Sequence, residues 1–147
     1  MNIKIPIKGP AVTRLQAAAV EVWHRGKEIK ARTPFEEAEL AQHRFNYELW
    51  HEEDQARRND VMDTVIAGVK RAIDRLNQKR NDAIEALDVF LLSEITRLDI
   101  FPRKDARLNT ETPGSTIDRM SILSLRLYHM TEEVGRADAA NEHRRKC

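Results

Sequence analysis

The chain has 147 residues, which is enough to bury the core of one domain and short for two. Hydrophobic residues make up 41% of the sequence and charged residues 33%, which excludes a disordered or membrane-embedded chain. The formal net charge of +1 lacks the basic excess of a general nucleic-acid binder and argues against such a partner.

Cysteine occurs once, at Cys147, so an intrachain disulfide and a zinc site of several thiolates are both excluded. This cysteine usage suits a reducing compartment, and the expected location is the cytoplasm. The opening residues lack the apolar run of a signal peptide, and no later segment reaches transmembrane length. We therefore expect no membrane partner.

Glycine and proline are scarce, at five each, which favours long helices over many short strands. Residues 1–10 are expected to form an extended arm. Apolar residues at helical spacing predict a first helix over 12–31, with Gly26 weakening its second half. Thr33 and Glu36 resemble a capping box, so a second helix is predicted to begin there and to end near residue 58.

A long third helix is predicted over 61–98, with Asp60 as its cap. Residues 99–114 form the main predicted loop. Ser115 and Asp118 resemble a second capping box, from which a fourth helix runs toward Glu142. Short connections join the first helix to the second and the second to the third, so these neighbours are expected to be antiparallel. The expected fold is all-α, an antiparallel up-down bundle of about four helices in a single domain over 1–147.

Polar residues follow the apolar seam of the third helix along one side. With helical residues 100° apart, this stripe contains Lys70, Asp74, Asn77, Asn81, Glu85 and Asp88. Arg80 lies within the seam, where a guanidinium needs a carboxylate or phosphate partner unless its stem reaches the edge. The second helix has a similar stripe, consisting of Asn46, Trp50, Glu53 and Arg57, with His43 and Asp54 at its edge.

In an antiparallel hairpin the two stripes are predicted to face each other and to line one groove. The expected neighbours are Asn46 with Asp74, Trp50 with Lys70, His43 with Asn77, and Glu39 with Asn81. The fourth helix is apolar on two sides, which is typical of a central helix or of an oligomer interface. One side carries Met120, Leu123, Leu127, Met130 and Val134, and the mixed second side carries Asp118, Ile122, Leu125, His129 and Glu132. A homodimer through this helix is therefore predicted.

The stripes allow a binding groove for a small charged ligand or a protein partner. The candidate ligand-binding residues are Asn46, Trp50, Arg57, Lys70, Asn77, Arg80, Asn81, Asp118, Arg119 and His129. A magnesium-dependent hydrolase of a phosphorylated small molecule is the alternative. Its metal candidates are Glu53, Asp74, Glu85 and Asp88, with Lys70, Arg57 and Arg80 holding phosphate.

Two short acidic patterns, Glu36 to Glu39 and Glu85 to Asp88, are similar to the E-x-x-E and E-x-x-D halves of helical nucleotide pyrophosphohydrolases. A buried polar network that sets the register of the helices would explain the same stripes without any catalytic or binding role. The sequence therefore leaves open whether the protein is an enzyme.

The histidines and the start of the fourth helix each have a structural interpretation as well as a functional one. His51 turns away from the stripe and is expected at the surface, whereas His43 and His129 are better candidates, although satisfied structural histidines explain both. Gly114 allows a close backbone approach, and the helix start behind it can bind an anion, with Arg119 one turn further on. A capped loop end accounts for the same residues.

Three ordered blocks are similar to the bacterial domain-of-unknown-function family 4254. They are NYELWHEED at 46–54, VKRAIDRLNQKRND at 69–82, and ETPGSTIDRMSIL at 111–123 followed by Tyr128, His129 and Met130. The resemblance spans roughly residues 40–147 and implies a helical protein without an assigned activity. It also implies that helix continues beyond the position of Cys147, so that this chain stops early.

Overall fold

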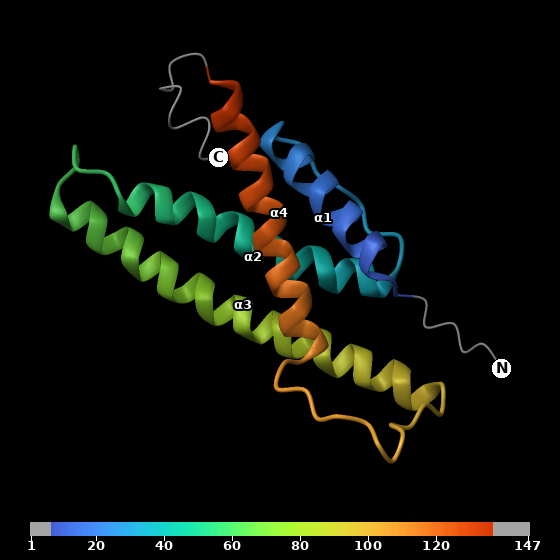
Figure 1. The fold of residues 1–147 in the computed structure, drawn as a ribbon. Coiled ribbons are helices and arrows are strands. Elements are labelled where there is room, and N and C mark those ends of the chain that lie inside the picture. Colours follow the sequence, from blue (N-terminus) through green and yellow to red (C-terminus); the bar gives the residue numbers. More distant parts are fainter. Residues whose placement is uncertain (1–6, 137–147) are drawn as a thin grey trace.

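The computed structural model describes residues 7–136, and this part of the chain folds into four helices without a strand (Figure 1). The helices are α1 (Gly9–His24), α2 (Pro34–Ala56), α3 (Asp63–Arg97) and α4 (Pro113–Gly135). The predicted all-α bundle with one long helix is confirmed. The expected extension of the fourth helix toward Glu142 and the early end of the chain lie outside the described residues.

Helix α1 ends at His24, seven residues earlier than predicted, because Gly26 terminates it. Gly26 adopts a left-handed conformation, with φ of 67°. Its N–H donates to the Trp23 carbonyl, and the N–H of Lys27 donates to the Val22 carbonyl, which is the Schellman arrangement of a helix end. Gly26 is therefore a stop signal rather than a weak point inside a longer helix.

The first two helices run in the same general direction, so the expectation that they would be antiparallel is wrong. Val12 shares a core cluster with Phe35 near the start of both helices, and the Trp23 ring contacts Tyr47 further along both. Residues 25–33 return beside α1 before α2 begins (Figure 1). Nine residues span up to roughly 30 Å, which exceeds the length of α1 at roughly 24 Å.

Helices α2 and α3 form the predicted antiparallel pair and make the most extensive helix contact of the fold (Figure 1). Phe35, at the start of α2, packs against Phe90 in the second half of α3. The Thr33 hydroxyl accepts from the N–H of Glu36 at 3.1 Å, which confirms the predicted cap of α2. The predicted cap of α3 is wrong, because Met62 occupies that position and Asp60 pairs with Arg58.

Helix α4 begins two residues before the predicted cap, and its cap is Thr112, whose hydroxyl accepts from the N–H of Ser115. Asp118 therefore lies inside the helix and is free to contact other helices. Close to this start, α4 touches α3. The N–H of Gly114 donates to the Asp88 carboxylate at 2.7 Å, and a Cβ at Gly114 would lie 2.6 Å from the Ile84 carbonyl oxygen.

Helix α4 also packs along α1, and the two helices cross the α2–α3 pair as a second layer (Figure 1). One core cluster contains Val12, Phe35, Leu87, Leu91 and Ile117 and joins all four helices. A second cluster, of Ala19, Trp23 and Leu40, lies between α1 and α2. Among the described residues, none of the helices is long and apolar enough to cross a membrane.

Candidate functional site

A buried polar network joins α1, α2 and α4 in the centre of the fold. His43 is enclosed by the Ser121 hydroxyl, 2.6 Å from its Nδ1, and by the Gln16 carbonyl oxygen, 3.0 Å from its Nε2. Burial lowers the pKa of His43 to about 4, so its ring is neutral at physiological pH. Both ring nitrogens have partners, which makes His43 the satisfied structural histidine that the sequence favoured.

Asp118 and Asn46 extend this network between α2 and α4. The Asp118 carboxylate accepts from the Gln42 amide at 2.6 Å and from the Asn46 amide at 2.8 Å. Asn46 also donates to Ser121 at 2.9 Å. A structural network of the kind expected from the stripes therefore exists, but the acceptors for Gln42 and Asn46 come from α4 rather than from α3.

Asn46 was expected near Asp74 and His43 near Asn77, but the hydrogen bonds of Asn46 and His43 are made to residues of other helices. Asn46 and His43 direct their polar atoms toward α4 and α1, and Asp74 is exposed. The cause is the second layer of helices, which covers this face of α2. The predicted neighbours were derived from a hairpin of the second and third helices alone, which lacks this layer.

Next to the network, α2, α3 and α4 enclose a groove of about 270 Å³, referred to below as the polar groove. It is lined by Asn46, Leu49, Trp50, Glu53, Asp54, Arg57, Asn77, Arg80, Ile122 and Leu125. Six of these residues, all except Leu49, Asp54, Ile122 and Leu125, are candidates from the sequence. The groove includes the α2 stripe, but Asn77 is the only one of its lining residues that belongs to the α3 stripe, and α4 forms an additional wall.

Arg80 is the basic residue of the groove without a partner. Its Nε is buried and has no hydrogen bond, and no ion pair joins the guanidinium to another described residue. Arg57, by comparison, lies 3.5 Å from the Asp54 carboxylate. The predicted structural ion pair of Arg80 is therefore not seen among the described residues.

The remaining candidates lie elsewhere. Lys70, Asp74, Asn81 and Glu85 are exposed on α3. The Asp88 carboxylate accepts a hydrogen bond from the N–H of Gly114, so it takes the place of the external anion predicted at the start of α4. Arg119 forms an ion pair with Glu111.

The four carboxylates predicted as magnesium ligands are not brought together. Within the described part of the chain, the only group of three or more potential ligands contains no carboxylate. Glu39, from the acidic pattern on α2, is buried, and burial raises its pKa to about 8. Its carboxyl group is therefore largely protonated at neutral pH and is a poor ligand for magnesium.

A cluster of three histidines lies where α1 ends beside α2 and α4. One ring nitrogen each of His24, His51 and His129 lies within 4.8 Å of those of the other two. The rings of Tyr47 and Tyr128 contact the cluster, and Tyr128 stacks on His24 at 4.3 Å between centroids. This histidine cluster was missed, because His51 was expected at the surface and His24 was not considered.

One signal for the cluster was present in the sequence. His43, Tyr47 and His51 are spaced four residues apart, which places a row of rings on one face of α2. That face points toward α1 and α4 rather than toward α3. The contribution of His24 and His129 had no local signal, since they come from two other helices.

His129 links the histidine cluster to the polar groove. Its ring stacks on Trp50 with centroids 4.7 Å apart and planes at 3°, and its Nδ1 lies 3.2 Å from the Glu132 carboxylate. Burial lowers the pKa of His129, the nearby His24 and His51 act in the same direction, and Glu132 acts against them. The neutral imidazole is thereby favoured.

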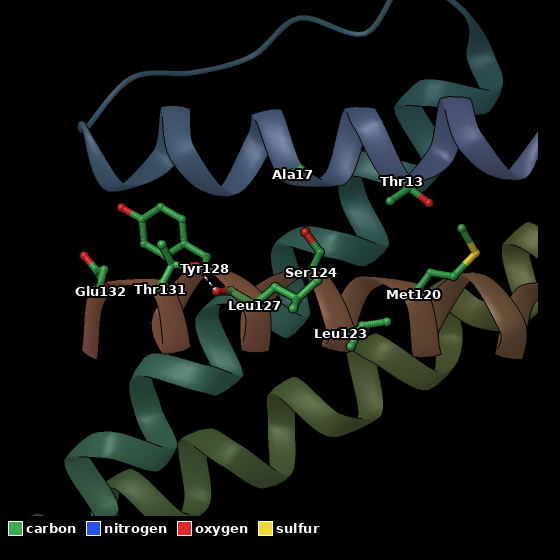
Figure 2. Close-up of a pocket in the computed structure, with 9 residues that line it drawn as sticks. All are labelled: Thr13, Ala17, Met120, Leu123, Ser124, Leu127, Tyr128, Thr131 and Glu132. Atoms are coloured by element: carbon green, nitrogen blue, oxygen red, sulfur yellow. Dashed lines mark hydrogen bonds between the residues drawn. The ribbon is translucent and has the colours of Figure 1, made fainter. Parts of the chain in front are cut away.

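A separate, apolar cavity of about 400 Å³ lies between α1 and α4 (Figure 2). Figure 2 shows Leu123 and Leu127 on α4 opposite Thr13 and Ala17 on α1, with Tyr128 and Glu132 at one end. Leu123 and Leu127 are 52% and 57% exposed, so the apolar side of α4 that they represent is largely outside the core. The homodimer through this helix stays a prediction.

Comparison with known proteins agrees with the resemblance read from the three blocks. A family model described as "Protein of unknown function (DUF4254)" matches residues 36–147, which include α2, α3 and α4. The matched range contains the whole polar groove and two of the three clustered histidines. No curated protein and no solved structure matches the chain.

Proposed function

The chain belongs to the domain-of-unknown-function family 4254, and for this member we propose a binding function. In this proposal, the polar groove between α2, α3 and α4 holds a small anionic molecule that carries a carboxylate or phosphate group. Recognition would come from Arg80, with the indole of Trp50 and the amide of Asn77 as further contacts.

The observation that supports this proposal is the unpartnered guanidinium of Arg80. A guanidinium cannot lose its proton in a protein, and a partly buried one without a counter-charge is costly. An anion in the groove would remove that cost through charge-assisted hydrogen bonds, which are among the stronger polar contacts in proteins. Arg80 Nε has its donor capacity free for such a bond.

The size and lining of the groove define the ligand further. A space of about 270 Å³ accommodates a small metabolite rather than a nucleotide with several phosphates. Leu49, Ile122 and Leu125 supply apolar walls. The ligand class is therefore a compact anion with an apolar or planar part.

The proposal is tested by thermal-shift screening with small carboxylates and monophosphates, followed by calorimetric titration of the compound that raises the melting temperature. A ligand specific for the folded state stabilises it by mass action. Arg80→Gln should weaken binding by about tenfold or more, the effect of losing a charged hydrogen bond. Arg75→Gln, on the exposed side of α3, is the matched control and should bind as the wild type. Equal affinity of both variants would overturn the role of Arg80.

The alternative of a magnesium-dependent hydrolase gains no support from the side-chain positions, because its four carboxylates point to separate surroundings. A cytoplasmic location remains part of the proposal. It is supported by the single cysteine in the chain and by the lack of a helix among residues 7–136 that could cross a membrane.

A further inference from the structure

We propose that His24, His51 and His129 form a binding site for a divalent transition metal of the zinc class. The site is separate from the polar groove, and the inference does not depend on the anion proposed there. Three helices contribute one ligand each, so the site would tie the end of α1 to α2 and α4.

The hydrogen bonds of the three rings leave the same nitrogen, Nε2, free in each ring. Nδ1 of His24 lies 2.8 Å from the Val20 carbonyl oxygen, and Nδ1 of His51 lies 2.8 Å from the Tyr47 carbonyl oxygen. A carbonyl oxygen can only accept, so Nδ1 must carry the proton in both rings. In the neutral rings, Nε2 is then left as a lone-pair donor.

His129 follows the same pattern with a carboxylate in place of a carbonyl. Its Nδ1 faces Glu132 at 3.2 Å, which again leaves Nε2 unprotonated in the neutral ring. Metal-bound histidines in proteins typically donate their second N–H to a carbonyl or carboxylate, which orients the ring and increases its basicity. All three rings of the histidine cluster have such an outer partner.

Two of the free nitrogens have no hydrogen-bond partner among the described residues. Nε2 of His24 and Nε2 of His129 are buried and have no hydrogen-bond partner. A buried polar atom without a partner is uncommon in folded proteins, and a bound ion is one of its recognised causes. His51 is half-buried, which leaves an approach from solvent.

The spacing of the rings fits a zinc-like ion after a small adjustment. At a metal–nitrogen distance of about 2.0–2.1 Å, nitrogens in a tetrahedral complex lie roughly 3.3 Å apart. The ring nitrogens lie within 4.8 Å of one another, so shifts on the order of 1 Å per ring close the site. Side-chain rotations on three fixed helices are sufficient for shifts of this size.

The donor set determines the chemical class of the ion. Three neutral imidazoles favour zinc and its first-row neighbours, whereas magnesium and calcium require oxygen ligands. Three protein ligands leave the fourth tetrahedral position to water or to a ligand from solution, as in catalytic rather than closed structural zinc sites. The site is therefore suited to a metal with an exchangeable ligand.

The first experiment is calorimetric titration of the chelator-treated full chain with zinc chloride. All variants carry Cys147→Ser, which removes the only thiolate of the chain as a competing ligand. We expect one zinc ion per chain, no comparable heat with magnesium, and an affinity that His51→Gln lowers by at least about tenfold. Glu37→Gln, at an exposed position of α2 away from the histidines, is the matched control and should bind zinc as the parent chain does. No zinc binding, or equal binding by His51→Gln, would overturn the site.

The second experiment needs no substitution of a ligand. X-ray absorption of the cobalt- or zinc-loaded chain reports how many imidazoles surround the metal. Three imidazoles plus one oxygen donor from water are expected, and fewer than three imidazoles contradict the proposal. This measurement remains decisive if circular dichroism shows that a histidine variant does not fold.

Discussion

The contact between the start of α4 and the middle of α3 is the most sharply defined packing constraint in the protein, and Gly114→Ala tests it. An added Cβ would lie 2.6 Å from the Ile84 carbonyl oxygen and 2.9 Å from the Asp88 carboxylate. Neither group can easily move away, because the Ile84 oxygen belongs to the backbone of α3 and the Asp88 carboxylate is held by its hydrogen bond. Helix α4 must therefore shift away from α3 to accept a methyl group.

The expected loss of stability has two parts. Forcing an extra carbon into a tight contact costs about 1–3 kcal/mol. Weakening the hydrogen bond from Gly114 to the charged Asp88, now 2.7 Å long, adds a further loss of about 1–3 kcal/mol. Alanine recovers at most about 1 kcal/mol through its better helix propensity. The net destabilisation should be about 1–6 kcal/mol, which for a chain of this length lowers the melting temperature by on the order of 10 °C.

Urea unfolding followed by circular dichroism measures this change, with Gly68→Ala as the matched control. Gly68 lies inside α3, and a Cβ there would meet no atom within 4 Å. This control should gain about 0.5–1 kcal/mol from helix propensity alone. If Gly114→Ala unfolds at the same urea concentration as the wild type, the close approach of α4 to α3 is incorrect.

Two further predictions concern buried polar groups. Burial raises the pKa of Glu39 to about 8, so the folded state binds more protons than the unfolded state between about pH 4.5 and 8, and stability should fall as pH rises through this range. Glu39→Gln should flatten that decline in urea unfolding at a series of pH values, and an unchanged slope would contradict a neutral buried carboxyl group. Asp118→Asn should destabilise the fold by about 1–2 kcal/mol, because its hydrogen bonds with Gln42 and Asn46 lose their charge. Asp82→Asn is the control, because Asp82 and its hydrogen-bond partner Gln78 are both exposed, and it should change the free energy of unfolding by less than about 0.5 kcal/mol. Equal losses of stability in the two variants would refute the role of the network.

Local features of the sequence determined the helices themselves. The apolar spacing predicted four helices and the long α3, and Thr33 with Glu36 located the start of α2 correctly. These signals extend over a few residues, since helical hydrogen bonds and caps join neighbours in the chain. Gly26 was also such a signal, and it marked the end of α1 more accurately than the apolar pattern did.

The candidate site shows where local patterns become insufficient. Asp118 has the spacing of a capping residue, yet it contacts α2, because Thr112 caps the helix instead. The antiparallel pairing of α2 with α3 followed from their short connection. Arg80, expected in the apolar seam, and Trp50, expected beside Lys70, meet in one groove only in the tertiary structure. The third wall, from Ile122 and Leu125, required knowledge of how α4 crosses that pair.

The histidine cluster is the clearest case of a feature decided only by the tertiary structure. His24, His51 and His129 belong to three helices and are separated by 27 and 78 residues in the sequence. Their meeting depends on the direction in which α1 packs and on the angle at which α4 crosses α2. Those quantities follow from the packing of all side chains at once, so they have no short-range signature in the chain, whereas helix periodicity and capping do.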